Sequence, residues 1–194
     1  MGNSIIKNFS QKKVKYVPAE RFTADVIMSI KNHNMEAFKA KHRVVDVLIL
    51  DDIQFLAGKE KTQEEFFHLF NALYEANKQI VLSSDRSPKS IPALAERLRS
   101  RFEGGMIGDI SYPDYETRIA ILKMKSQEKG IAFSDDVLDY VATNIQRNIR
   151  ELEGALNRLI AYQKINGQPP GLETAKSLLK TLFLSPHKTI NCKE

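Results

Sequence analysis

The chain has 194 residues, of which 42% are hydrophobic and 27% charged, and its formal net charge is +5 at pH 7. These proportions are typical of a globular chain and exclude an intrinsically disordered one, and the length predicts one domain with a small satellite. The longest apolar runs are too short to span a bilayer, and no secretory signal opens the sequence. The single cysteine, Cys192, excludes an internal disulfide and fits a reducing compartment. Lysine and arginine are interspersed with aspartate and glutamate, so the charge allows nucleic acid as a partner without requiring it.

The first half of the sequence predicts strands that alternate with helices. The expected strands are 13–17, 45–50, 79–83 and a short one at 106–110. The expected helices are 19–32, 35–42, 62–77 and 91–101. The third of these helices opens with Thr62-Gln63-Glu64-Glu65, which has the form of a capping box. The alternating order implies right-handed crossovers and a parallel sheet, so the fold class is α/β.

After Pro113 the pattern changes to helices alone. The expected helices are 115–129, 135–144, 149–166 and 172–182, separated by turn residues. We therefore predict an α/β domain at 1–112, a small helical domain at 113–184 and a linker at 185–194.

Three aspartates follow two of the expected strands directly. Asp51 and Asp52 end the apolar run that begins at Val45, and Asp85 follows Ser83 and Ser84 at the end of the next strand. Ligands of open α/β sheets bind beyond the carboxyl ends of the strands, so these side chains are candidates for one shared site. An ordinary acidic turn, and an Asx turn before Pro88, would account for the same residues.

Two groups of arginines are candidates for phosphate contacts. Arg97 and Arg101 lie four positions apart on a short expected helix, and Arg150 and Arg158 lie eight apart on a later one, with Gly154 between them. The spacing places each pair on one face of its helix, and a glycine there lets another backbone approach closely. A solvated basic face is the alternative for both pairs.

Three stretches of the sequence carry a family resemblance. They are VDVLILDDIQFLAGKEKTQEEFFHLFNALYEANKQIVLSSDR, RLRSRFEGG and NIRELEGALNR. Together they closely resemble the DnaA family of bacterial replication initiators, which belongs to the AAA+ nucleotide switches, and the resemblance runs from about Lys13 to Leu182. It implies an AAA+ core whose N-terminal part is missing, followed by a small helical lid.

The resemblance also implies roles at the nucleotide. Asp51 and Asp52 match the Walker B pair, which binds Mg²⁺ and orients water, and Asp85 matches sensor 1. Arg150 matches sensor 2, which contacts the nucleotide from the lid. The implied cofactors are ATP or ADP with Mg²⁺, held by a parent protein with slow ATPase activity.

Further matched positions imply contacts between subunits and with DNA. Arg101 matches the arginine finger that reaches ATP on the neighbouring subunit, with Arg97 and Arg158 at the same kind of interface. The positions matched to single-stranded DNA in the central channel are Ile27, Lys59 and Lys61. The implied partners are origin DNA, further copies of the protein in a filament and other initiation proteins, in the bacterial cytoplasm.

One motif of the family does not occur in these 194 residues. No GxxxxGK[ST] phosphate loop is present, and residues 3–9 look like the end of the helix that follows such a loop. We therefore expect a segment of an initiator that also lacks the C-terminal helix-turn-helix, that binds ATP very weakly or not at all and is inactive alone. The alternatives are a stand-alone ATPase, which the missing loop disfavours, and a nucleotide-free regulator that caps or blocks the initiator filament.

Overall fold

The computed structural model describes residues 2–183, which fall into two compact units. The first unit ends at Gly108 and the second begins at Asp109. The linker expected at 185–194 lies outside the described residues. None of the helices within the described range has the length and hydrophobicity that crossing a membrane would require.

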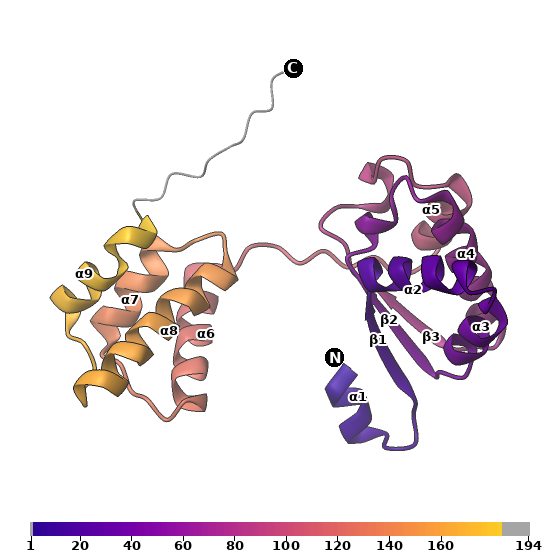
Figure 1. Cartoon of the computed structure of the whole chain (residues 1–194). Helices are drawn as coiled ribbons and strands as arrows, with labels where there is room; N and C mark the ends of the chain where they lie inside the picture. The colour runs from indigo at the N-terminus through magenta and orange to yellow at the C-terminus, as the bar shows by residue number, and fades with distance from the viewer. Residues whose placement is uncertain (1, 184–194) are drawn as a thin grey trace. The chain divides into compact units, whose positions relative to one another are not determined.

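The first unit contains a parallel three-stranded sheet, as the sequence predicts. The strands are β1 (Val14–Pro18), β2 (Val47–Asp51) and β3 (Gln79–Leu82), and β2 is the central one. The register pairs Tyr16 with Ile49 and Leu50 with Leu82. Figure 1 shows the three strands side by side, with the helices of this unit around them.

Aromatic side chains from the helices complete the core of this unit. Its helices are α1 (Gly2–Asn8), α2 (Ala19–Lys31), α3 (Met35–Arg43), α4 (Glu60–Glu75) and α5 (Glu96–Glu103), with 3-10 turns η1 (Ile53–Leu56) and η2 (Pro88–Ser90). Phe22 of α2 and Phe66 of α4 are fully buried, and their rings meet edge to face at 5.5 Å. Both belong to one cluster with Leu48 and Leu50 of β2, so this cluster fixes α2 and α4 against the central strand.

Two expected helix starts in the first unit are wrong. Helix α4 begins at Glu60, and Thr62 is a buried residue of its first turns with 2% exposure, so the expected capping box is not formed. Helix α5 begins only at Glu96, because Ala93 adopts a left-handed backbone with φ of 51° that no helix can contain.

The short strand expected at 106–110 is also wrong. These residues form neither helix nor strand, and Met106 and Ile110 are 100% and 96% exposed. A strand is stabilised by hydrogen bonds to a neighbouring strand, and in the described part of the chain no strand pairs with this segment.

The second unit is a bundle of helices, as expected. They are α6 (Tyr115–Glu128), α7 (Asp135–Asn144), α8 (Ile149–Asn166) and α9 (Leu172–Phe183). Local signals set their ends: the Asp114 side chain accepts a 2.8 Å hydrogen bond from the Thr117 N–H before α6, and Gly167 ends α8 with φ of 76°. Leu122, Val137 and Leu159 are among the buried residues of a single apolar core.

Candidate functional site

The carboxyl end of β2 carries a carboxylate with two hydroxyl donors. Asp51 accepts a 2.6 Å hydrogen bond from Tyr16 Oη of the neighbouring strand and another from Ser83 Oγ. Just after the end of β3, the backbone is still hydrogen-bonded to β2: the Ser83 N–H donates to Leu50 O at 3.1 Å. The hydrogen bond to Asp51 raises the pKa of Tyr16, since losing the phenolic proton would leave two negative groups in contact.

Asp52 is joined to the end of β3 through a glutamine. Its backbone N–H donates to Ser83 Oγ at 3.0 Å, and its carboxylate accepts a 3.0 Å hydrogen bond from Gln54 Nε2. The other end of that amide, Gln54 Oε1, accepts from Ser84 Oγ at 3.2 Å and from the Asp85 N–H at 3.4 Å. The structure thus brings the three expected aspartates to one edge of the sheet.

Asp85 has an ion-pair partner beside it in the chain. Arg86 Nε donates to Asp85 Oδ1 at 2.9 Å and Arg86 Nη2 donates to Oδ2 at 2.8 Å. These hydrogen bonds lower the pKa of Asp85, so its carboxylate stays ionised. A group that binds here must compete with Arg86 for the carboxylate or displace it.

The donor set at this edge suits a magnesium ion that is also bound to phosphate. Asp51 and Asp52 supply adjacent carboxylates, and residues 2–183 contain no cluster of three or more His, Cys, Asp or Glu side chains that could enclose a metal ion. Mg²⁺ is usually held by one or two carboxylates together with water and substrate phosphates, and not in a cage made of protein alone. The two residues could therefore hold Mg²⁺ on a nucleotide.

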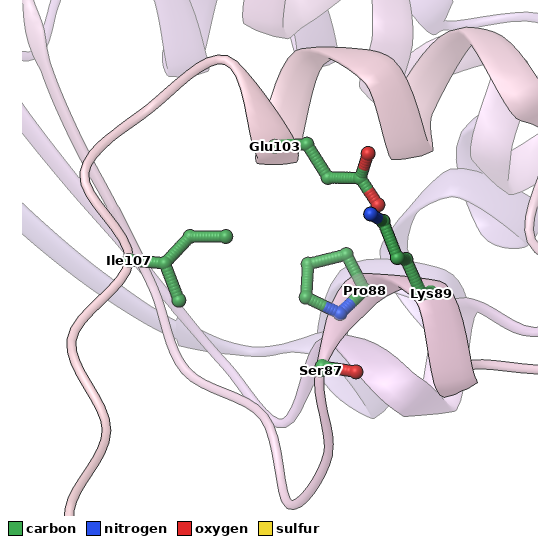
Figure 2. Close-up of a pocket in the computed structure, with 5 residues that line it drawn as sticks. All are labelled: Ser87, Pro88, Lys89, Glu103 and Ile107. Carbon is green, nitrogen blue, oxygen red and sulfur yellow. The ribbon is translucent and has the colours of Figure 1, made fainter.

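A hollow lies between η2 and the end of α5, which both follow Asp85 in the chain. It is lined by Ser87, Pro88, Lys89, Glu103 and Ile107. Figure 2 shows the side-chain ends of Lys89 and Glu103 pointing toward one another on one side of the hollow, with Ile107 on the other. The hollow is open to solvent and lies outside the aspartate network, so we assign no ligand to it.

The arginines of α5 have different surroundings. Arg97 lies over the ring of Phe67 at 4.8 Å, and Arg101 lies over the ring of Tyr74 at 5.8 Å, both rings belonging to α4. Neither guanidinium donates a hydrogen bond to any described residue, whereas the third arginine, Arg99, is tied by hydrogen bonds. Arg97 and Arg101 thus both face α4 from the same side of α5, which agrees with their spacing of four positions.

The residues matched to DNA contacts lie on neighbouring elements. Ile27 of α2 is 46% exposed, and α2 packs against η1, which leads into the loop that carries Lys59. The Lys61 side chain is 84% exposed, and its ammonium lies 4.0 Å from the Glu64 carboxylate. An apolar side chain and two lysines are thus accessible on this part of the first unit.

The remaining matched arginines belong to α8 of the second unit. The Arg150 backbone N–H donates to the Asn148 cap at 3.0 Å, and its side chain is exposed. Arg158 Nη1 donates to Thr181 Oγ1 of α9 at 3.0 Å. A Cβ added at Gly154 would meet nothing within 4 Å among the described residues, so the close backbone approach expected there has no counterpart within the unit.

Sequence reasoning did not find two polar members of the aspartate network. Tyr16 reaches Asp51 only because the register sets β1 beside β2, which no local pattern reveals. Gln54 lies two positions after Asp52, and that proximity was the available signal. The aromatic partners of the α5 arginines, Phe67 and Tyr74, belong to another helix, α4, so no spacing within α5 indicates them.

Comparison with known proteins gives consistent similarities. The model of the bacterial DnaA ATPase domain family matches residues 1–109. A chromosomal replication initiator protein DnaA from Caldanaerobacter subterraneus subsp. tengcongensis is 54% identical over 193 residues, which cover 100% of this chain and 44% of the relative. The chain therefore spans less than half the length of the curated relatives it matches.

Solved structures agree with these sequence matches. Domain III of the replication initiation protein DnaA from Thermotoga maritima superposes with a TM-score of 0.91 and 37% identity, covering 95% of this chain and 77% of that one. A replication initiator DnaA bound to AMPPCP and single-stranded DNA superposes with a TM-score of 0.74 and 41% identity, covering 80% and 48%. The fold is thus an AAA+ core with a helical lid.

Proposed function

This chain belongs to the bacterial DnaA ATPase domain family, and on that premise we propose that it is the switch segment of a replication initiator that assembles on origin DNA when ATP is bound. Its curated relatives are named as initiators. They give no support to the alternative of a nucleotide-free regulator.

We assign the aspartate edge to the nucleotide. Asp51 and Asp52 would hold Mg²⁺ on the phosphates and orient the attacking water, and Asp85, on the next strand, would sense the γ-phosphate through that cation or an ordered water. Two features support this assignment: Gln54 links Asp52 to the Asp85 turn, and two adjacent carboxylates suit a phosphate-bound Mg²⁺. Arg150 acts as the second sensor from the lid.

We assign Arg101 to the neighbouring subunit's nucleotide in a filament. The observation that carries this proposal is that the Arg101 guanidinium donates no hydrogen bond to any described residue. Its planar set of N–H groups therefore remains available for a phosphate. Arg97 lies on the same side of α5 and supports the same contact, and Arg158 serves the subunit interface from the lid.

Single-stranded DNA is the second proposed ligand. Ile27, Lys59 and Lys61 are exposed on neighbouring elements, where lysines contact backbone phosphates and the apolar side chain contacts the sugars or bases. The solved DnaA complex with AMPPCP and single-stranded DNA supports this class of ligand for the family.

ATP binding by the 194 residues alone is expected to be weak. The residues at the edge of the sheet are mainly carboxylates, which repel phosphates unless a cation intervenes, and the sequence contains no phosphate loop. Catalytic turnover by this chain in isolation is correspondingly not expected.

The test is Arg101→Ala in a complete initiator that carries these residues. We expect an unchanged ATP dissociation constant for the monomer and loss of ATP-dependent assembly on origin DNA. Arg101→Lys should fail as well, because a point charge lacks the planar fork. Arg43→Ala is the matched control, since it removes one exposed arginine from α3.

Two outcomes would contradict the assignment. Loss of ATP binding by the Arg101→Ala monomer would mean that the residue acts on its own nucleotide. Normal assembly by the same variant would mean that Arg101 is an ordinary surface residue.

A further inference from the structure

Helix α5 carries three arginines within five residues, and within the described part of the chain hydrogen bonds tie only one of them. Arg99 Nη1 donates to Glu96 Oε2 at 2.8 Å, and Arg99 Nη2 donates to Leu94 O at 3.3 Å. These contacts hold Arg99 against the start of its own helix. Arg99 therefore has a structural role, which separates it from Arg97 and Arg101.

The other two arginines contact aromatic ring faces of α4. Arg97 lies 4.8 Å from the Phe67 ring centroid and Arg101 lies 5.8 Å from that of Tyr74. Both distances are within the range of attraction between a cation and a ring face. Such a contact restrains the guanidinium without consuming its N–H donors, which remain available for a bidentate phosphate contact.

The ring beneath Arg101 is itself held in place. Tyr74 is 62% exposed, yet its ring stacks on that of Phe70 with an interplanar angle of 11° and a centroid distance of 6.3 Å. Phe70 is 8% exposed and belongs to the core of the first unit. The core thus supports Tyr74 through Phe70, and Tyr74 in turn supports Arg101.

We propose that Phe67 and Tyr74 are positioning residues that hold Arg97 and Arg101 ready for the phosphates of a neighbouring subunit's nucleotide. The inference rests on the proposed function, because it requires these arginines to act between subunits. Restraint before assembly lowers the entropy that each side chain loses when it meets the phosphate. Removing a ring should therefore weaken assembly and leave nucleotide binding by the monomer unchanged.

The first test compares Tyr74→Leu with Tyr74→Phe in the complete initiator. Tyr74→Leu should weaken ATP-dependent assembly by about two- to fivefold, the fold-change that an exposed cation–ring contact supports. Tyr74→Phe keeps the ring and should assemble like the parent. Equal losses in both variants would overturn the proposal, because the hydroxyl and not the ring would then matter.

A double-variant comparison separates positioning from general stability. In an Arg101→Ala background, at protein concentrations raised until part of the assembly returns, Tyr74→Leu should cause no further loss of assembly, since the residue that it positions is already gone. An equal further loss would show that Tyr74 acts through the fold. Phe67→Leu, tested with Arg97→Ala in the same way, provides an independent comparison if Tyr74→Leu does not fold.

A direct measurement is available on the 194-residue chain. The Nε–Hε resonance of Arg101 should move toward the position of a free arginine in Tyr74→Leu and stay in place in Tyr74→Phe, while that of Arg99 stays fixed in both. An unmoved Arg101 signal in Tyr74→Leu would overturn the proposal. Normal assembly by Arg101→Ala would instead overturn the proposed function, and parental assembly by Tyr74→Leu beside a failing Arg101→Ala would overturn only this inference.

Discussion

Gln63 of α4 accepts a 2.7 Å hydrogen bond from the backbone N–H of Ala95, the residue that caps α5. The same amide donates through Nε2 to Leu56 O at 2.9 Å and to Ala93 O at 3.0 Å. With 4% exposure, this one side chain joins the end of η1 to the start of the arginine-bearing helix.

We predict that Gln63→Leu lowers the free energy of unfolding of the first unit by about 2 to 3 kcal/mol, because the Ala95 N–H loses its partner and two carbonyls lose one donor each. Gln63→Glu keeps the acceptor for Ala95 but places a carboxylate against two carbonyl oxygens. Its stability deficit should shrink as the pH falls and the carboxyl gains a proton that it can donate. Denaturant unfolding at several pH values measures both effects, and a Glu variant that matches the parent at neutral pH would contradict the account.

We predict a loss of stability below about pH 6.5 caused by His42. This residue is 1% exposed, and its Nδ1 lies 2.8 Å from Phe38 O, while its Nε2 is buried without a hydrogen-bond partner. Burial is the main cause that lowers its pKa below the ordinary value of 6.5, and Lys15 and Lys41 lower it further, whereas the Phe38 carbonyl and Asp25 oppose them.

The direction of this pH dependence follows from proton uptake by the unfolded chain. Between the ordinary pKa and the lowered one, the unfolded chain binds a proton that the folded chain does not, so stability falls as the pH falls, by at most about 1.4 kcal/mol per pH unit. His42→Phe retains an aromatic ring and removes this titration. The difference between the parent and this variant in urea unfolding, followed from pH 7.5 to pH 5, isolates the effect, and parallel curves would exclude it.

We predict that binding of single-stranded DNA by the isolated chain is weak, independent of sequence and strongly salt-dependent. Lys61→Ala should reduce the affinity uniformly for all sequences and reduce the salt slope by about 0.7, the value for one phosphate contact with a single strand. Lys164→Ala removes an exposed lysine from α8 and should leave both quantities unchanged. Tight binding to one duplex sequence at moderate salt would be the contrary result.

We predict that Arg118 of α6 stabilises the second unit by capping the C-terminal end of the neighbouring helix α7. Its Nε donates to Ala142 O in the last turn of α7 at 2.9 Å, and its Nη1 donates to Pro113 O at 2.8 Å. The last carbonyls of a helix have no partner within it, and a cation is favourable there. Arg118→Leu should therefore cost about 2 to 3 kcal/mol, and Arg118→Lys less.

Hydrogen exchange checks this prediction element by element. The amides of α6 and α7 should exchange faster in Arg118→Leu, and those of α4 should not change, because α4 belongs to the other unit. Faster exchange in α4 to the same extent would show that the effect is global.

The sequence predicts an element well where its signals are local. The expected bounds of α7 and α8 coincide with the observed ones, since the Asn148 cap and Gly167 lie at the ends of α8 itself. The start of α4 was wrong because it depends on a distant contact: the Gly58 N–H donates to Ala93 O at 3.1 Å. That contact directs the chain into the helix at Glu60, two residues before Thr62, where the helix was expected to begin.

The candidate site likewise contains features that the sequence predicts and contacts that it does not. Strand order alone predicts that Asp51, Asp52 and Asp85 lie at one edge, because parallel strands end together. The contact of Tyr16 with Asp51 requires the register of β1 against β2, and the contact of Arg101 with Tyr74 requires the packing of α5 on α4. Neither can be derived from spacing within one element.

The backbone at the end of β2 also restricts which acid can occupy the second position of the pair. Asp52 has φ of 58° and ψ of 53°, a left-handed conformation that aspartate and asparagine tolerate better than other residues with side chains. Asp52→Asn therefore removes the charge at little backbone cost, whereas Asp52→Glu keeps the charge and strains the turn. At this position, the geometry of the main chain selects the shorter of the two acidic residues before any ligand is bound.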